Sequence, residues 1–181
     1  MTLNLSVNGY REGAPSALQL DSARSKRYAT RVDFENALIA EAMTWVGTPF
    51  HKQGNLKGVG VNCGNFIDGV LTTIGVNTNS APQNWGRADQ QDGKLLLQLL
   101  EDNDLEFVSI EDRKKGDIIA FCKESLDNPD EPVHIAFVVD ITHTTIIVEA
   151  GRKGVVRHRL NGLWNARIHS IWRIPDKLWL K

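Results

Sequence analysis

The chain has 181 residues, of which 41% are hydrophobic and 24% charged, and its formal net charge is -1. This length suits one domain with a single core, and the near-neutral charge excludes bulk attraction to nucleic acid or to an anionic membrane. Two cysteines are too few for a disulfide framework, and no apolar run is long enough to span a membrane. We therefore expect a globular chain whose function depends on a local group of residues.

Residues 1–32 are polar and are interrupted by Gly9, Gly13 and Pro15. We interpret them as a partly ordered N-terminal extension. They lack a basic start followed by an apolar stretch, so we predict no secretory signal. The chain is then expected to be synthesised in the cytoplasm, and action at the cell envelope would require another delivery route.

Periodic apolar residues predict three helices in the first part of the chain. The first begins at Asp33, whose side chain can cap it, and ends at Gly47. The second follows a glycine-rich loop and begins at Asn62 or Cys63, with one apolar stripe along its length. A third, short helix is predicted for residues 95–100.

After residue 116 the sequence changes to short segments rich in Val and Ile, which are typical of strands in an antiparallel sheet. The predicted strands are residues 117–122, 133–139, 144–149, 154–159 and 166–174. Helices followed by strands indicate an α+β architecture. We place the main domain at residues 33–181.

Cys63 is the strongest candidate for a nucleophile. A thiolate attacks far better than a thiol, and a helix N-terminus stabilises the negative charge through its unpaired N–H groups. Cys63 follows the good N-cap residue Asn62, while Gly64 leaves room for a substrate carbonyl beside the sulfur. The backbone N–H of Cys63 is a candidate oxyanion donor. The alternative is that Cys63 is a buried structural cysteine, since free cysteines are often buried. We expect such a buried, structural role for Cys122.

His134 is the candidate base, because it lies within a predicted strand among small apolar residues and therefore needs a partner. If Val139 pairs with Thr144 across the turn, His134 lies directly opposite Glu149. The carboxylate would then accept the Nδ1–H of the imidazole and stabilise its cation. The alternative is an ordinary cross-strand pair with no role in catalysis.

The other four histidines are less suitable as the base. His143 lies at a predicted turn, while His158 and His169 lie in later strands without an evident cysteine partner. His51 precedes Cys63 in the loop and is a candidate substrate contact. The histidines and cysteines form no zinc-binding pattern, so no metal or other cofactor is predicted.

Three blocks of sequence, spread over residues 36–172, resemble the NlpC/P60 cysteine peptidases, especially their phage-associated branch. The first block joins residues 42–51, which include Trp45-Val46-Gly47-Thr48-Pro49-Phe50, to residues 58–66, which include Asn62-Cys63-Gly64. The second joins residues 116–121, which begin with Gly116-Asp117, to His134-Ile135-Ala136-Phe137. The third joins Ile147-Val148-Glu149-Ala150 to Gly154-Val155-Val156-Arg157. The resemblance implies a papain-like fold in which N-terminal helices carrying the cysteine pack on an antiparallel sheet carrying the histidine.

The resemblance also implies a function, namely hydrolysis of an amide bond in a bacterial peptidoglycan peptide by residues 33–181. Cys63, His134 and Glu149 would be catalytic, and Phe50, His51, Asn62, Gly64 and Trp85 would bind substrate. Phage or secretion-apparatus proteins are the partners that such a chain would use for delivery.

Departures from the family pattern leave other functions open. Asn62 replaces an Asp, Phe50 replaces a Tyr, and Glu149 stands where the family has His, Asn or Gln. One alternative is a related amidase or acyltransferase that acts on a substrate other than peptidoglycan. Another is a non-catalytic module of a phage structure, or one that binds the cell wall.

Overall fold

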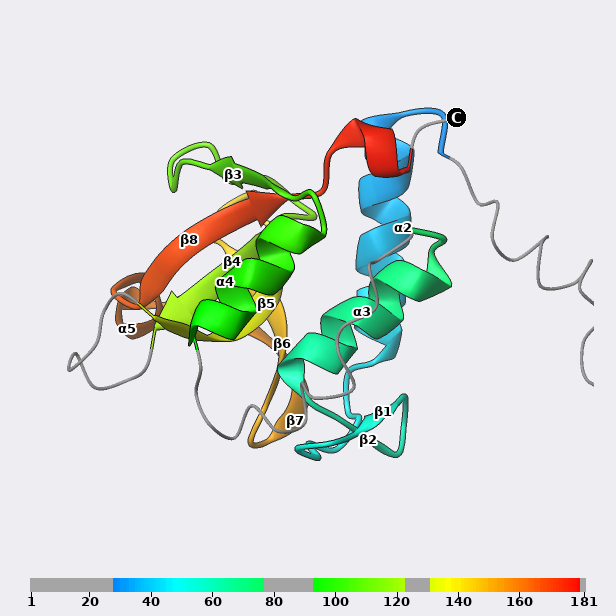
Figure 1. Ribbon diagram of the computed structural model, residues 1–181, viewed down its shortest axis with the longest axis vertical. Coiled ribbons are helices and arrows are strands. Elements are labelled where there is room, and N and C mark those ends of the chain that lie inside the picture. Colours follow the sequence, from blue (N-terminus) through cyan, green and yellow to red (C-terminus); the bar gives the residue numbers. More distant parts are fainter. Residues whose placement is uncertain (1–27, 77–92, 123–130, 180–181) are drawn as a thin grey trace, which may run out of the picture.

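The computed structural model describes residues 28–76, 93–122 and 131–179. The fold combines helices with an antiparallel sheet (Figure 1), which confirms the predicted α+β class. Most of the predicted N-terminal extension, and Trp85, lie outside the described residues.

The helical part consists of α2 (Arg31–Thr44), α3 (Cys63–Thr73) and α4 (Gly93–Asp102). The prediction that Asp33 caps the first helix is wrong. Thr30 is the N-cap, because its hydroxyl oxygen accepts a hydrogen bond from the backbone N–H of Asp33 at 3.1 Å. The loop between α2 and α3 contains a two-stranded sheet of β1 (Asn55–Leu56) and β2 (Gly60–Val61), which the sequence pattern did not predict.

The main sheet has six strands, all paired antiparallel, in the order β3-β8-β4-β5-β6-β7. Five of them correspond to the predicted strands: β4 (Ile118–Cys122), β5 (Pro132–Asp140), β6 (Ile146–Gly151), β7 (Gly154–Arg159) and β8 (Ile168–Arg173). The short edge strand β3 (Glu106–Val108) and the helices α5 (Gly162–Asn165) and η2 (Asp176–Leu178) were not predicted.

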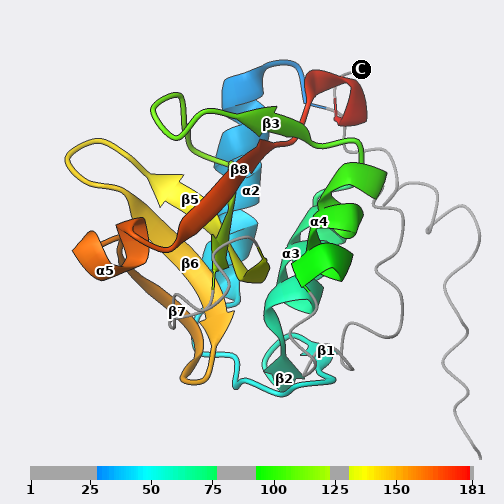
Figure 2. The same cartoon turned by 60° about the vertical axis from the view of Figure 1, so that its left-hand side comes forward.

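The two faces of the sheet bury different sets of side chains. Figure 2 shows α3 and α4 on one side of the sheet and α5 on the other. On the helical side, Phe66 of α3 meets Phe137 of β5 edge to face, with ring centroids 5.7 Å apart, within the larger hydrophobic cluster. On the other side, Ala136 and Val138 of β5 belong to a smaller cluster that Trp164 of α5 covers.

The two ends of the described fold meet. The backbone N–H of Tyr28 donates to the carbonyl of Trp179 at 3.2 Å, and the Trp179 ring stacks on Phe34 with centroids 4.8 Å apart. In Figure 1 the C-terminal η2 accordingly lies beside the start of α2. No helix among the described residues is long and apolar enough to cross a membrane.

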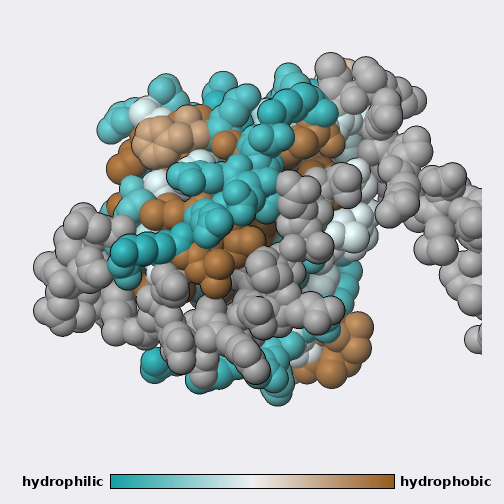
Figure 3. Space-filling model, viewed as in Figure 1, coloured by the Kyte–Doolittle hydropathy of each residue, from teal (hydrophilic) through white to brown (hydrophobic). Residues whose placement is uncertain are grey.

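Hydrophobic areas show at several places on the face in Figure 3. The large exposed hydrophobic side chains include Phe107 of the edge strand β3, and Leu56 and Val59 of the β1–β2 hairpin.

Candidate active site

Helix α3 begins at Cys63, as the capping pattern predicted. Asn62 is the N-cap: its Oδ1 accepts the backbone N–H of Asn65 at 2.8 Å, and its Nδ2 donates to the carbonyl of Lys52 at 2.7 Å. The same side chain therefore caps the helix and fixes the preceding loop. Asn62 is buried, so its placement as an N-cap is shown while direct contact with a substrate stays a prediction.

Backbone contacts between the two sides of the loop before Cys63 hold it in a compact conformation. The backbone of Gly54 packs directly on that of Gly60, leaving no space for a Cβ atom at residue 54. Phe50 forms a bridge with Val61, and the N–H of His51 donates to the Val61 carbonyl at 3.1 Å. Phe50 and His51 are thus exposed beside the strand that leads into Cys63.

His134 approaches Cys63 from the beginning of β5. The ladder between β5 and β6 ends at the pair Ala136–Glu149, so the first residues of β5 have no partner on β6. The Cys63 thiol interacts with the His134 imidazole and with the backbone N–H groups of Ile135 and Gly64, and each of these interactions lowers its pKa. The structure therefore brings together the predicted nucleophile and the predicted base.

Glu149 also reaches His134, although the predicted strand register is wrong. Glu149 lies opposite Ala136, two residues from the predicted partner, because the pair nearest the turn is Asp140–Ile146 rather than Val139–Thr144, so the loop is longer than predicted. The Glu149 carboxylate crosses the ladder diagonally, and its Oε2 lies 3.0 Å from Nε2 of His134. The expected contact through Nδ1 is thus replaced by one through Nε2, which leaves Nδ1 on the side available to the thiol.

The contact between Glu149 and His134 is an ion pair rather than a well-aligned hydrogen bond. Neither Nε2 nor Oε2 has a partner with good hydrogen-bond geometry within the described residues, although the two atoms are close enough for one. Their side chains are 15% and 8% exposed, so water screens the attraction weakly.

These contacts favour the charged forms of all three groups. Burial raises the pKa of the Cys63 thiol, but hydrogen bonding to His134 and its positive charge outweigh burial and lower that pKa overall. Burial likewise opposes charge on His134, while Cys63 and Glu149 raise its pKa to about 9. Burial also raises the pKa of Glu149, yet His134 and His158 bring it down to about 2.

His158 belongs to the same group and was not predicted. Its Nε2 lies 3.6 Å from Oε1 of Glu149, and this interaction is the largest cause that raises the pKa of His158. The sequence contained a usable signal. Residues 151–154 form a two-residue turn, which sets Glu149 opposite Val156 and His158 on the same face of the sheet.

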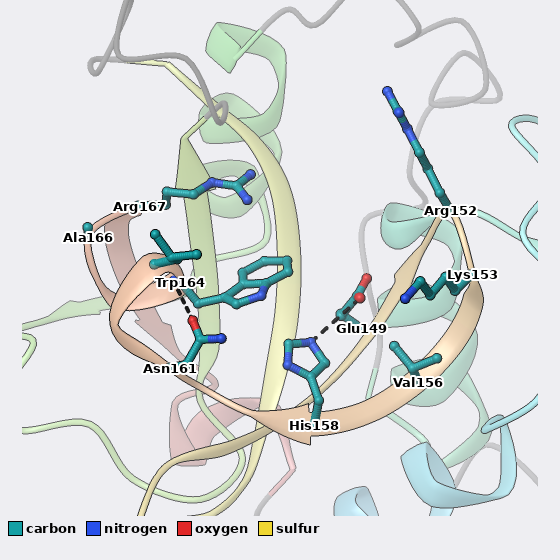
Figure 4. A pocket seen from close by; sticks show the side chains of 10 residues that line it. Glu149, Arg152, Lys153, Val156, His158, Asn161, Trp164, Ala166 and Arg167 are labelled. Carbon is teal, nitrogen blue, oxygen red and sulfur yellow. Dashed lines mark hydrogen bonds and ion pairs between the residues drawn. The ribbon is translucent and has the colours of Figure 1, made fainter.

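An open cavity of about 850 Å³ adjoins Glu149 on this side of the sheet. Figure 4 shows its wall, in which the ring of His158 is turned toward Glu149 and Trp164 stands beside them. The other lining residues are Arg152, Lys153, Val156, Asn161, Leu163, Ala166 and Arg167. Neither Phe50 nor His51 lines this cavity, so their predicted contact with substrate stays a prediction.

The solved structures with a fold similar to this chain include a protein of a known family. No protein-family model matches the sequence, and no curated protein matches it either. A crystal structure of a protein similar to a lipoprotein, of the NLP/P60 family, from Staphylococcus aureus subsp. aureus Mu50 superposes with a TM-score of 0.57 and 16% sequence identity. The match covers 82% of this chain but 43% of that protein. The chain therefore has an α+β fold similar to part of an NLP/P60-family protein.

Proposed function

We propose that the chain is a cysteine hydrolase that cleaves an amide bond in a bacterial cell-wall peptide. The observation that supports it best is the interacting pair of Cys63 and His134, formed between a helix N-terminus and a strand and extended by Glu149. A helix carrying the cysteine against a sheet carrying the histidine is the arrangement expected of a papain-like enzyme. The similarity in fold to an NLP/P60 protein supports the choice of substrate class.

The first half of the reaction would acylate the enzyme. The Cys63 thiolate attacks the amide carbonyl carbon, and the oxygen takes the negative charge beside the backbone N–H of Cys63. The His134 imidazolium then gives its proton to the nitrogen as the C–N bond breaks. The amine leaves, and a thioester joins Cys63 to the acyl part of the substrate.

The second half would release the acyl group. His134, now neutral, takes a proton from a water molecule as the water oxygen attacks the thioester carbonyl. The C–S bond breaks, a carboxylic acid product leaves, and the thiolate–imidazolium pair is restored. Glu149 stays ionised throughout and stabilises the imidazolium without accepting its proton.

Residues 33–181 would form the catalytic domain in this proposal, with residues 1–32 as an extension. The motif resemblance to the phage-associated branch suggests delivery to the cell wall by phage or secretion-apparatus proteins. Phe50, His51, Gly64 and Trp85 are the residues that we propose for substrate contact, since the first two are exposed beside the Cys63 loop and Gly64 adjoins the sulfur.

The reactivity of Cys63 toward iodoacetamide tests the mechanism. We expect fast alkylation of Cys63 that stays constant down to about pH 6, whereas a free cysteine loses reactivity below its pKa near 8.5. Cys122, which is buried in β4, supplies the control: Cys122→Ala should retain the reaction and Cys63→Ala should lose it. A reactivity that titrates near pH 8.5 would contradict an activated nucleophile.

Peptide release tests the substrate. Wild-type protein is incubated with purified peptidoglycan, and the new amino groups are measured, with Cys63→Ala as the matched inactive variant. We expect release by the wild type alone. If Cys63 is activated but no peptide is released, the hydrolase is retained and the cell-wall substrate is wrong.

A further inference from the structure

The Glu149 carboxylate contacts two imidazoles, one with each oxygen. Oε2 lies 3.0 Å from Nε2 of His134 on β5, and Oε1 lies 3.6 Å from Nε2 of His158 on β7. The Glu149 side chain is 8% exposed and that of His158 is 27% exposed, and both residues line the open cavity. Figure 4 shows this contact from the cavity.

The protons on His158 follow from its two neighbours. Its Nδ1 lies 3.1 Å from the carbonyl oxygen of Arg159, a group that only accepts hydrogen bonds. Its Nε2 faces a carboxylate, which in the ionised form also only accepts. A carbonyl at Nδ1 and a carboxylate near Nε2 both favour a protonated ring, so this geometry favours the imidazolium form of His158.

Gly151 lies directly against the Glu149 carboxylate. A Cβ atom at Gly151 would lie 2.5 Å from Oε2 and 3.0 Å from Oε1 of Glu149. Any side chain at residue 151 would therefore push the carboxylate away from its present position. Trp164 covers the pair of histidines, since its ring centroid lies 6.0 Å from that of His134 and 5.1 Å from that of His158.

We propose that His158 is a positioning residue, which holds Oε1 of Glu149 so that Oε2 stays against the His134 ring. His158 does not touch the reacting thiol and acts through the carboxylate. Without it, Glu149 is free to turn toward the cavity and its solvent, where its attraction to the His134 imidazolium is weaker. The inference rests on the proposed function, because it takes Cys63 and His134 as the reacting pair.

Other charged groups lie near His158. Glu149 faces it from β6 and His134 from β5, Arg157 and Arg159 flank it on β7, and the cavity wall adds Arg152, Lys153 and Arg167. The variants below leave His134, the arginines and the lysine unchanged, and Glu149 is replaced only in the double-mutant comparison.

The experiment measures the alkylation rate of Cys63 against pH in variants of the full chain. For His158→Ala we expect the midpoint to rise by about one pH unit, so that the rate below the midpoint falls about tenfold. His158→Gln can still donate to Oε1 and should lie closer to the wild type. Gly151→Ala displaces the same carboxylate without changing a titratable group, and should give a shift in the same direction.

A double-mutant comparison separates positioning from a general structural role. If His158 acts through Glu149, adding His158→Ala to Glu149→Gln should leave the midpoint of Glu149→Gln unchanged. The inference would be overturned if His158→Ala shifted the midpoint as much in the Glu149→Gln variant as in the wild type. It would also be overturned if His158→Ala and Gly151→Ala both kept the wild-type profile. His143→Ala is the control, because His143 lies exposed in the turn after β5. A wild-type Cys63 that titrates like free cysteine would instead refute the proposed function.

Discussion

Glu149 pairs with Ala136 across the β5–β6 ladder, yet its carboxylate contacts the ring of His134, two residues further along β5. Diagonal neighbours on one face of an antiparallel pair are within reach of long side chains. A glutamate suits this geometry because its reach exceeds that of Asp or Asn. The contact places a negative charge beside the base, on the face of the sheet that lies away from α3.

Replacing Glu149 by Gln should lower the activity about ten- to a hundredfold. The neutral amide no longer stabilises the His134 imidazolium, so the pKa of His134 falls and that of the Cys63 thiol rises. The measurement is kcat/KM on a released cell-wall peptide together with Cys63 alkylation against pH. Glu111→Gln, on an exposed surface, is the matched control. Unchanged values in Glu149→Gln would limit Glu149 to a structural role.

Activity should decline in alkaline solution as His134 loses its proton. The pKa of His134 is raised to about 9, so the imidazolium that protonates the leaving amine persists to about that pH and is lost above it. A profile of kcat/KM between pH 5 and pH 10 checks this limb. Because Cys63 and His134 titrate as a coupled pair, the apparent pKa of this alkaline decline in kcat/KM describes the pair rather than His134 alone. A limb near pH 6.5 would show that the imidazole is unperturbed.

The same two groups predict how stability depends on pH. Glu149 has a pKa of about 2 in the fold and an ordinary value of 4.5, so its contribution is present above pH 4.5 and is lost as the pH falls toward 2. His134 has the opposite sign: its contribution is complete below pH 6.5 and is lost as the pH rises through 9. The free energy of unfolding, measured with urea at different pH values, should therefore be highest between pH 4.5 and pH 6.5.

The Glu149→Gln variant tests whether the pH dependence of stability comes from the Glu149–His134 pair. Its free energy of unfolding should vary less with pH at both limits than that of the wild type, by roughly 1–3 kcal/mol. An identical pH dependence in the two proteins would assign the variation to other groups.

Asn62→Ala should lower the free energy of unfolding by about 1–2 kcal/mol, because the cap of α3 and a partly buried hydrogen bond to the Lys52 carbonyl are both removed. Asn62→Asp keeps the capping oxygen and should be less destabilised. It also adds negative charge next to Cys63, so the thiol pKa should rise. Urea unfolding and alkylation profiles of both variants check the two effects. An Ala variant as stable as the wild type would contradict the role of the cap.

The ion pair between Asp117 and Arg173 should be the most costly to break outside the site. The Asp117 side chain is 2% exposed and its Oδ2 lies 2.9 Å from Arg173 Nη2. Arg173→Met leaves this buried carboxylate without its cation, with the backbone N–H of Lys114 as a remaining donor, at about 3–5 kcal/mol. Lys177→Met is the control, since its pair with Asp104 is exposed on both sides and worth less than about 1 kcal/mol. If urea unfolding showed that Arg173→Met and Lys177→Met lose the same free energy of unfolding, the predicted difference between the two ion pairs would be wrong.

The sequence predicted features that depend on neighbouring residues. The start of α3 at Cys63 was predicted because capping by Asn62 is a local interaction. The strand from Gly154 to Arg159 was predicted with the observed bounds, because its pattern is bounded by a glycine turn. The edge strand β3 was missed, since three largely exposed residues carry too little pattern to distinguish a strand from a loop.

The register around the site was predicted less well. The predicted turn was too short, because the pair nearest the loop is Asp140–Ile146, and an irregularity between Val138 and Asp140 changes the register by one residue. The contact between His134 and Glu149 was nevertheless predicted, because a shift of two residues keeps both side chains on the same face. His158 was missed because it was compared with the cysteine, whereas its partner is the carboxylate.

The hydrogen bond between Tyr28 and Trp179 has a consequence for protein engineering. Residues that are far apart in the sequence are here adjacent in space, so the fold from residue 28 to residue 179 begins and ends at one point. Such a segment can be inserted into a surface loop of a host protein without separating the two sides of that loop. The same proximity permits a circular permutant, in which a short linker joins these residues and new ends open in an exposed turn.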